Sequence, residues 1–326
     1  SGFIGLHVVD QLLAQGHSVR ATFRQRAPTP LLRKRRVELV AASLQDRASL
    51  ERAMDGCQWV FLLAGHYPRY SLHLEQQLEI GTQGVKNACE AARASGVERL
   101  IYTSSSASLA TRPGQTADED DVPISMPEDS VYRALKWAME REVEEAQRRG
   151  LSTVTLLPGG CIGPGDYRLG TGGLFVAAVR GVLPFWVEGQ VNLVDVEDVA
   201  RAQLAAVHAP SARYCLAPHT RSFGDLLHDV VARYGGRVPE QVSPLHARQR
   251  AEAAERAAEP SKARVMFPRE LVDIITTAGP IDCGRAQREL GMSFSQLEPA
   301  FDRAHAFFTR VGYLPHLAAT RKARAS

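Results

Sequence analysis

A tyrosine and a lysine four positions apart carry the clearest chemical signal in this sequence. Tyr132 and Lys136 fall in a segment with helical periodicity, so their side chains lie one turn apart on one helix face. A phenol, with an ordinary pKa of about 10, exchanges protons poorly at neutral pH, but a neighbouring ammonium stabilises the phenolate and lowers that pKa. The pair is suited to protonating an alkoxide as hydride reaches a carbonyl carbon. The same spacing also occurs by chance in helix surfaces, so it needs support from other residues.

Hydroxyl side chains supply part of that support. Thr103-Ser104-Ser105-Ser106 end a predicted strand about 27 residues before Tyr132. Ligands bind at the carboxyl edge of parallel sheets, where these side chains would lie. A serine there can hydrogen-bond the substrate oxygen and the phenol together. For at least two of the three serines, the alternative is that they bind backbone groups at the end of the strand.

Two glycines at the start of the chain fit the opening of a nucleotide-binding helix. Gly2 and Gly5, with Phe3 and Ile4 between them, match the last two glycines of a G-x-x-G-x-x-G turn, and an apolar helical pattern follows. Such a turn lets pyrophosphate approach the free amides of the helix N-terminus. The first glycine and the strand before it do not occur in these 326 residues. We therefore expect about ten further residues upstream in the native protein, because the sheet would otherwise have a gap.

The order of elements predicts an α/β protein. Strands are expected at residues 17–24, 59–65, 99–103 and 152–157, and helical patterns separate them. This alternation is typical of a parallel sheet with helices on both faces. Beyond Pro158 the pattern becomes less regular, with glycine-rich loops and then helices, which predicts a smaller lobe for the substrate.

Composition excludes several classes of protein. The chain is 44% hydrophobic and 23% charged, with a net charge of +3, which is typical of a globular protein and gives no sign of a nucleic-acid partner. The sequence has no apolar run long enough for a membrane span and no metal-ligand spacing. Its five cysteines are widely separated, which favours reduced thiols and a cytoplasmic location.

Taken in order, these motifs resemble the extended short-chain dehydrogenase/reductases. The glycine turn, the strand-end serines, Y-x-x-x-K and the P-G-G-C-I-G-P-G-D run at 158–166 all occur at the family's spacing. Within that family the chain looks most like the dihydroflavonol-4-reductase, 3β-hydroxysteroid dehydrogenase and hopanoid-associated epimerase-like branch. Further matches lie at residues 63–65, 90–92, 192–200 and 282–291.

The resemblance implies a fold and a division of the chain. The fold is a Rossmann-type doubly wound parallel sheet with a smaller, mostly helical C-terminal substrate lobe. Residues 1–157 and about 189–212 would form the NADP(H)-binding domain, about 158–188 and 213–315 the substrate lobe, and 316–326 a basic tail. By analogy, a homodimer through the helix that carries Tyr132 is also expected.

The resemblance also assigns roles to individual residues. Ser105 takes the position of the catalytic serine or threonine, Tyr132 that of the acid/base, and Lys136 that of the residue that lowers the phenol pKa and holds the nicotinamide ribose. The other cofactor contacts it implies are Gly2, Phe3, Ile4, Gly5, Arg24, Ser43, Leu44, Ala64, Gly65 and Pro158.

Arg24 decides the expected cofactor. It falls where NADP-preferring relatives place the arginine that meets the 2′-phosphate, whereas NAD binders carry a carboxylate there. The alternative for Arg24 is a solvated charge at the end of a strand. This chain departs from the family pattern at two positions. Ser43 replaces the aspartate that relatives place near the adenine, and Gly81 falls near the position where relatives carry an asparagine of the proton relay.

Three functions remain open at this stage. The first is reduction of a ketone or aldehyde of a small, apolar or aromatic metabolite by NADPH, which Arg24 favours. The second is epimerisation of a nucleotide sugar with tightly held NAD(P), and the third is a non-catalytic nucleotide-binding protein. Dehydration is disfavoured because Ser106-Ala107 follow Ser105 in place of an Asp-Glu pair.

Six side chains are candidates for the substrate pocket, although each of them has packing in the small lobe as its alternative. They are Tyr67, Tyr70, Cys161, Tyr167, Phe185 and Trp186.

Overall fold

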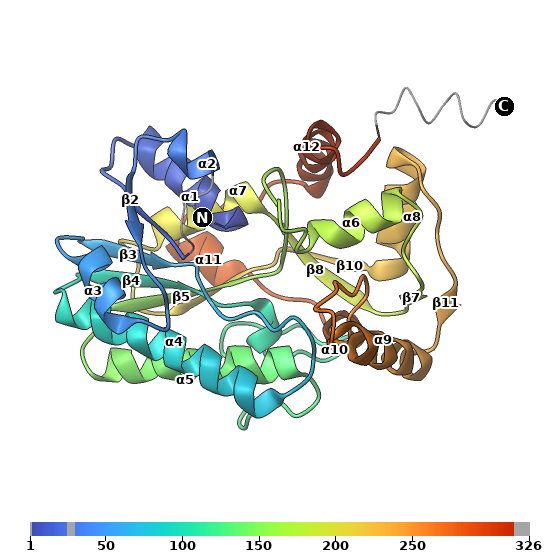
Figure 1. Cartoon of the computed structure of the whole chain (residues 1–326), viewed down its shortest axis with the longest axis horizontal. Helices are drawn as coiled ribbons and strands as arrows, with labels where there is room; N and C mark the ends of the chain where they lie inside the picture. The colour runs from blue at the N-terminus through green and yellow to red at the C-terminus, as the bar shows by residue number, and fades with distance from the viewer. Residues whose placement is uncertain (1, 25–29, 316–326) are drawn as a thin grey trace.

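The computed structural model describes residues 2–24 and 30–315, which form a larger α/β lobe and a smaller lobe beside it (Figure 1). The larger lobe contains a four-stranded parallel sheet in the order β3-β4-β5-β9. Its strands are β3 (Trp59–Leu62), β4 (Arg99–Thr103), β5 (Thr153–Pro158) and β9 (Arg213–Leu216). A separate parallel pair is formed by β1 (Arg20–Phe23) and β2 (Glu38–Ala41).

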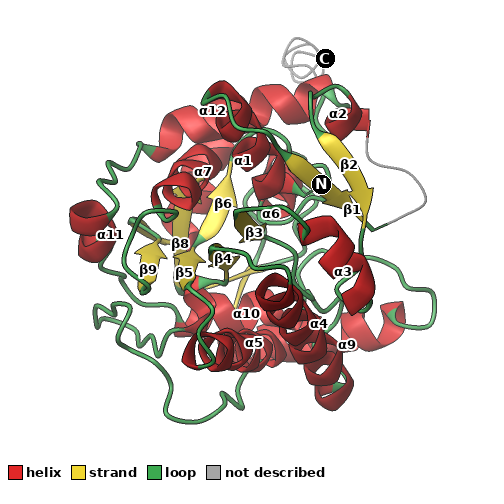
Figure 2. Ribbon diagram, turned by 90° about the vertical axis from the view of Figure 1, so that its left-hand side faces the viewer, coloured by secondary structure: helices red, strands yellow, loops and turns green. Residues whose placement is uncertain are grey.

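Helices cover both faces of this sheet (Figure 2). On one face lie α3 (Arg47–Met54), α4 (Leu74–Ala94) and α5 (Val131–Arg148), and on the other lie α7 (Val196–Ala205) and α11 (Gly284–Glu289). Side chains alternate across a strand, so Leu100 and Tyr102 of β4 pack under α4 and α5 while Ile101 packs toward α7. The predicted α/β fold with a parallel, doubly covered sheet is thereby confirmed.

Helix α1 (Phe3–Ala14) connects the two sheets. Leu6 and Val9 pack with Ala21 of β1, whereas Val8 and Leu12 pack with residues of α7 and β3. Short α2 (Pro30–Arg33) lies beyond the segment 25–29, which falls outside the described residues, as does the expected basic tail at 316–326.

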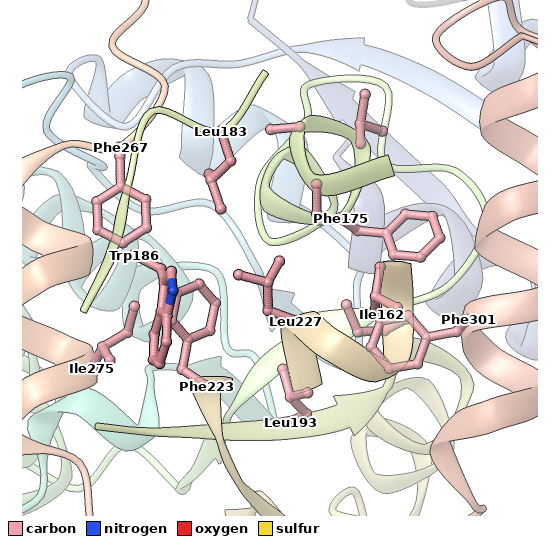
Figure 3. Close-up of a cluster of buried hydrophobic side chains, with 14 of the residues drawn as sticks. Ile162, Phe175, Leu183, Trp186, Leu193, Phe223, Leu227, Phe267, Ile275 and Phe301 are labelled. Carbon is pink, nitrogen blue, oxygen red and sulfur yellow. The ribbon is translucent and has the colours of Figure 1, made fainter. Parts of the chain in front are cut away.

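The smaller lobe is built around an aromatic core (Figure 3). Its strands are β6 (Gly160–Ile162), β8 (Gln190–Asp195) and β10 (His219–Ser222) in the order β10-β8-β6, together with the pair β7 (Trp186–Val187) and β11 (Gln241–Val242). Its helices are α6 (Gly172–Val179), α8 (Phe223–Tyr234), α9 (Pro244–Ala258), α10 (Arg269–Thr277) and α12 (Leu297–Arg310).

The chain crosses between the lobes at different points from those expected. Residues 213–216 were assigned to the substrate lobe, but β9 pairs with β5 and so extends the main sheet. Residues 190–195 were assigned to the nucleotide-binding domain, but β8 pairs with β6 and β10 in the smaller lobe. Strand pairing fixes both memberships, and short strands of this kind have little sequence signal of their own.

Gly81 lets α4 and α5 approach closely beneath the site. A Cβ atom at this position would clash with the fully buried Leu135 and would lie 3.3 Å from the Met139 sulfur. Tyr132 and Lys136 share α5 with both of these residues. Gly81 thus has a packing role, because a larger residue would require the Leu135 side chain or α5 to shift.

Replacing Gly81 with alanine should therefore destabilise the protein. Alanine favours a helix over glycine by about 0.5–1 kcal/mol, but overpacking a buried contact costs about 1–3 kcal/mol, so we expect a net loss. Urea denaturation measures the change, and Lys86→Ala, on the exposed side of α4, serves as the control. A Gly81→Ala variant more stable than the wild type would contradict the packing role.

Candidate active site

Tyr132 and Lys136 lie together at the start of α5. The helix begins after Ser130, whose side chain accepts a hydrogen bond from the Arg133 amide and caps the first turn. Tyr132 and Lys136 are both buried, and the lysine Nζ lies 5.5 Å from the centroid of the tyrosine ring. The helical spacing therefore brings the two functional groups into one buried environment.

Burial sets the protonation of the tyrosine. It raises the pKa of the Tyr132 phenol, the nearby Glu270 carboxylate raises it further, and a hydrogen bond with Ser105 lowers it. Burial is the largest of these influences, so the lowering of the phenol pKa by Lys136 that the sequence predicts is not seen. The phenol is protonated at neutral pH, the state that a proton donor requires.

Lys136 experiences opposing influences. Burial lowers its pKa to about 8, while the carboxylates of Glu140 and Glu270 raise it. Glu140 lies one turn further along α5 and accepts hydrogen bonds from the Ser104 hydroxyl and, at 2.9 Å, from the Arg213 guanidinium. Two buried carboxylates, one from each lobe, thus help to keep the ammonium charged.

Ser105 is the serine that meets the phenol. It caps the short 3₁₀ turn Ser106–Ser108, and its hydroxyl oxygen accepts a hydrogen bond of 3.2 Å from the Ala107 amide. Ser104 is engaged instead with Glu140, and Ser106 is buried. The structure therefore brings Ser105, Tyr132 and Lys136 together at the carboxyl end of β4.

The residues predicted for a dinucleotide surround this position in a compatible way. Ala64 and Gly65 follow β3 and are exposed, and a Cβ on Gly65 would lie 3.9 Å from the Lys136 Nζ. A Cβ on Gly2, the N-cap of α1, would meet nothing within 4 Å, so the first amides of that helix are open to an anion. These features fit a dinucleotide that passes from α1 toward Lys136.

The remaining cofactor positions lie at neighbouring strand ends. Pro158 ends β5, and Arg24 follows β1 with an exposed side chain. After β2, the Ser43 hydroxyl accepts a hydrogen bond from the Gln45 amide, and the Leu44 carbonyl accepts one from the Asn87 side chain. All of them follow or end parallel strands, as ligand-binding positions in such sheets do.

The predicted substrate residues separate into two groups. Tyr67 lies beside Tyr132, with ring centroids 5.2 Å apart, and Cys161 lies close enough to raise the Tyr132 pKa slightly. Burial raises the pKa of the Cys161 thiol to about 12, so it remains protonated and does not act as a nucleophile.

The other four residues are engaged elsewhere. The Tyr70 hydroxyl donates to the carbonyls of Ala258 and Ala263. The Tyr167 ring packs on Phe307. Phe185 is buried in the core of the smaller lobe against Phe267, and Trp186, labelled in Figure 3, is buried there against Gly224, so packing accounts for both.

Glu140 and Glu270 are the site residues that sequence reasoning missed. Glu140 could have been found, because it lies four residues after Lys136 on the same helix face. Glu270 gives no such signal, since α10 reaches the site only through the packing of the smaller lobe. Its carboxylate accepts a hydrogen bond of 2.5 Å from the Tyr67 hydroxyl.

Residues 2–24 and 30–315 contain neither a clustered metal site nor a membrane-spanning helix. No group of three or more His, Cys, Asp and Glu side chains is arranged to hold a metal ion. No helix there has the length and apolar character that crossing a bilayer requires.

Comparison with known proteins places this geometry in a family. The model of the NAD dependent epimerase/dehydratase family matches residues 1–215. This chain belongs to that family. The resemblance to extended short-chain dehydrogenase/reductases is thereby confirmed, and a nicotinamide cofactor is the one that the family uses.

Relatives of this chain include reductases and an epimerase. A putative dihydroflavonol 4-reductase from Synechocystis sp. is 29% identical over 323 residues, covering 96% of this chain and 94% of the relative. Cinnamoyl-CoA reductase 1 from Oryza sativa is 29% identical over 255 residues, covering 72% and 74%. The crystal structure of a nucleoside-diphosphate-sugar epimerase from Pseudomonas aeruginosa is 25% identical and superposes with a TM-score of 0.76, covering 96% of both chains.

Proposed function

We propose that this protein is an NADPH-dependent reductase that converts a ketone or aldehyde of a small, apolar or aromatic metabolite to the alcohol. The observation that carries the proposal is the buried contact of Tyr132 with Lys136 and Ser105 at the edge of the sheet. Relatives named as reductases cover most of the chain and support the same chemistry.

Each site residue has a task in this reaction. The bound cofactor supplies the hydride. Ser105 orients the carbonyl oxygen, and Tyr132, held protonated by burial, gives its proton to that oxygen as the alkoxide forms. Lys136 stabilises the phenolate that remains, because its ammonium lies against the same ring. Lys136 would also hold the nicotinamide ribose, for which its position beside Gly65 is suitable.

The choice of NADPH rests on charge at the end of β1. Arg24 is exposed there, and a guanidinium binds a phosphate in bidentate fashion. The second candidate function, epimerisation of a nucleotide sugar with tightly held NAD(P), is supported by the likeness to the Pseudomonas aeruginosa epimerase. Reduction is favoured over epimerisation because NADPH exchanges freely with solution and its hydride is consumed in the reaction. An epimerase instead keeps its cofactor bound and returns the hydride to the product.

Replacing Tyr132 with phenylalanine should reduce kcat by about 10²–10⁴-fold and leave cofactor affinity nearly unchanged. The ring still packs against Tyr67, but the proton donor is lost. Steady-state kinetics with NADPH and cofactor fluorescence titration measure the two quantities, and Tyr313→Phe removes a tyrosine hydroxyl that bonds the Tyr167 carbonyl, away from the site. Substantial turnover by Tyr132→Phe would refute the mechanism.

Replacing Arg24 with alanine should weaken NADPH binding by about 1–3 kcal/mol and affect NADH little, because only NADPH carries the 2′-phosphate. Fluorescence titrations with both cofactors give the two changes. Arg36 is an exposed arginine of the basic run Arg33-Lys34-Arg35-Arg36, and the Arg36→Ala variant controls for a general loss of positive charge. Equal losses for NADPH and NADH would remove Arg24 from the phosphate site.

A further inference from the structure

A buried carboxylate beside Tyr132 raises the pKa of Lys136 but has no direct contact with the substrate in the proposed mechanism. Glu270, in the first turn of α10, is only 5% exposed. Its Oε1 accepts the Tyr67 hydroxyl at 2.5 Å, and the Tyr67 ring lies 5.2 Å from that of Tyr132. A chain of contacts therefore runs from the smaller lobe through Tyr67 to the proton donor.

The hydrogen bonding of Glu270 is incomplete. A carboxylate accepts hydrogen bonds at both oxygens, and a buried one is costly unless it is well paired. Among the described residues, Tyr67 is the donor found for this side chain. Burial accordingly raises the pKa of Glu270 to about 7, while Tyr67 and the charge of Lys136 lower it. A second donor arriving at the free oxygen would stabilise the ionised form.

Both members of the Tyr67–Glu270 pair are held by surrounding contacts. The fully buried Glu255 of α9 accepts hydrogen bonds from the backbone amides of Ser71 and Arg269, so one carboxylate ties the segment after Tyr67 to the residue before Glu270. The Tyr70 hydroxyl adds a bond of 2.6 Å to the Ala263 carbonyl. A pair fixed in this way from both lobes is preorganised, as a recognition site requires.

The Tyr67 side chain is 60% exposed even though its hydroxyl is bonded to a buried group. Its ring therefore offers an accessible aromatic surface between Tyr132 and Glu270. A flat apolar substrate lying against this ring with its carbonyl at Tyr132 would have a substituent next to the carbonyl on the side of Glu270, which bonds the Tyr67 hydroxyl and influences the pKa of both Tyr132 and Lys136.

We propose that Glu270 is a specificity-determining residue that accepts a hydrogen bond from a hydroxyl group adjacent to the substrate carbonyl. The substrate class is then neutral α-hydroxy carbonyl compounds, and a carbonyl compound with an adjacent carboxylate is rejected by charge repulsion. This inference rests on the proposed reductase function and narrows its substrate.

Three aromatic probes of similar size test the inference: acetophenone, 2-hydroxyacetophenone and phenylglyoxylate. Ligand-observed NMR measures their binding to the NADP⁺-loaded protein, in which a ketone cannot be reduced. Because hydrogen bonds to charged groups contribute about 1.5–3 kcal/mol, the wild type should bind the hydroxyketone at least tenfold more tightly than acetophenone. Phenylglyoxylate should bind more weakly than either.

Glu270→Gln should lower the hydroxyketone preference at least fivefold and improve binding of phenylglyoxylate, because the amide is neutral and donates to a carboxylate. Glu270→Asp keeps the charge, so it should still reject phenylglyoxylate while losing part of the hydroxyl preference. The control is Glu259→Gln, which neutralises a carboxylate that lies 2.6 Å from the His73 ring nitrogen and should leave the binding ratios unchanged.

Absence of a hydroxyl preference in the wild type, or a preference that survives in Glu270→Gln, would overturn the inference. Turnover of the same probes with NADPH is measured separately. If hydride is transferred but the ratio of hydroxyketone to acetophenone affinity is the same in the wild type and in Glu270→Gln, the reductase proposal stands and this inference is wrong. Binding ratios that follow Glu270 with no hydride transfer to any probe would support the binding role and contradict the reductase proposal.

Discussion

The site depends on keeping a lysine charged inside the protein. Burying the Lys136 ammonium lowers its pKa from 10.5 to about 8, a net cost of about 3 kcal/mol to the charged form. Burial would lower it further without Glu140 and Glu270, whose carboxylates raise it. The same burial keeps the Tyr132 phenol protonated. One environment therefore holds a protonated phenol beside a charged ammonium, the arrangement that the proposed proton transfer requires.

The fold supplies this environment from distant parts of the chain. Helix α5 carries Tyr132, Lys136 and Glu140 on successive turns, and Gly81 allows α4 to pack closely against it. Arg213 on β9 and Ser104 after β4 satisfy Glu140 from the sheet side. The smaller lobe adds Glu270, and the buried Glu255 ties that lobe to the segment that carries Tyr67. Loosening the contact between the lobes would thus move the Glu270 carboxylate away from Lys136 and also displace the segment that carries Tyr67.

Regular periodicity made the larger elements predictable. The strand expected at 99–103 coincides with β4, and the helical pattern expected between the strands at 59–65 and 99–103 corresponds to α4. Strands β2 and β9 are missing from the expected elements, because they have no clear pattern of their own and depend on pairing with β1 and β5. The spacing of Tyr132 and Lys136 predicted their contact, since a helix fixes neighbours within one chain segment.

Tertiary packing decided what the sequence left open. From the sequence, Phe185 and Trp186 could belong either to the substrate pocket or to the core. The contacts of Phe185 with Phe267 and of Trp186 with Gly224 place both in the core. Glu270 reaches Tyr132 only because α10 packs across the lobe boundary, so no local pattern identifies it.

Transfer of deuterium from the cofactor tests the central claim most directly. The protein is incubated with NADPH deuterated at C4, each face in a separate sample, together with a panel of neutral aromatic ketones and aldehydes, and the products are examined by mass spectrometry. The account predicts an alcohol that carries one deuterium from one of the two faces, formed as NADPH is oxidised. An isomerised product without deuterium and without net oxidation of NADPH would contradict it and favour the epimerase.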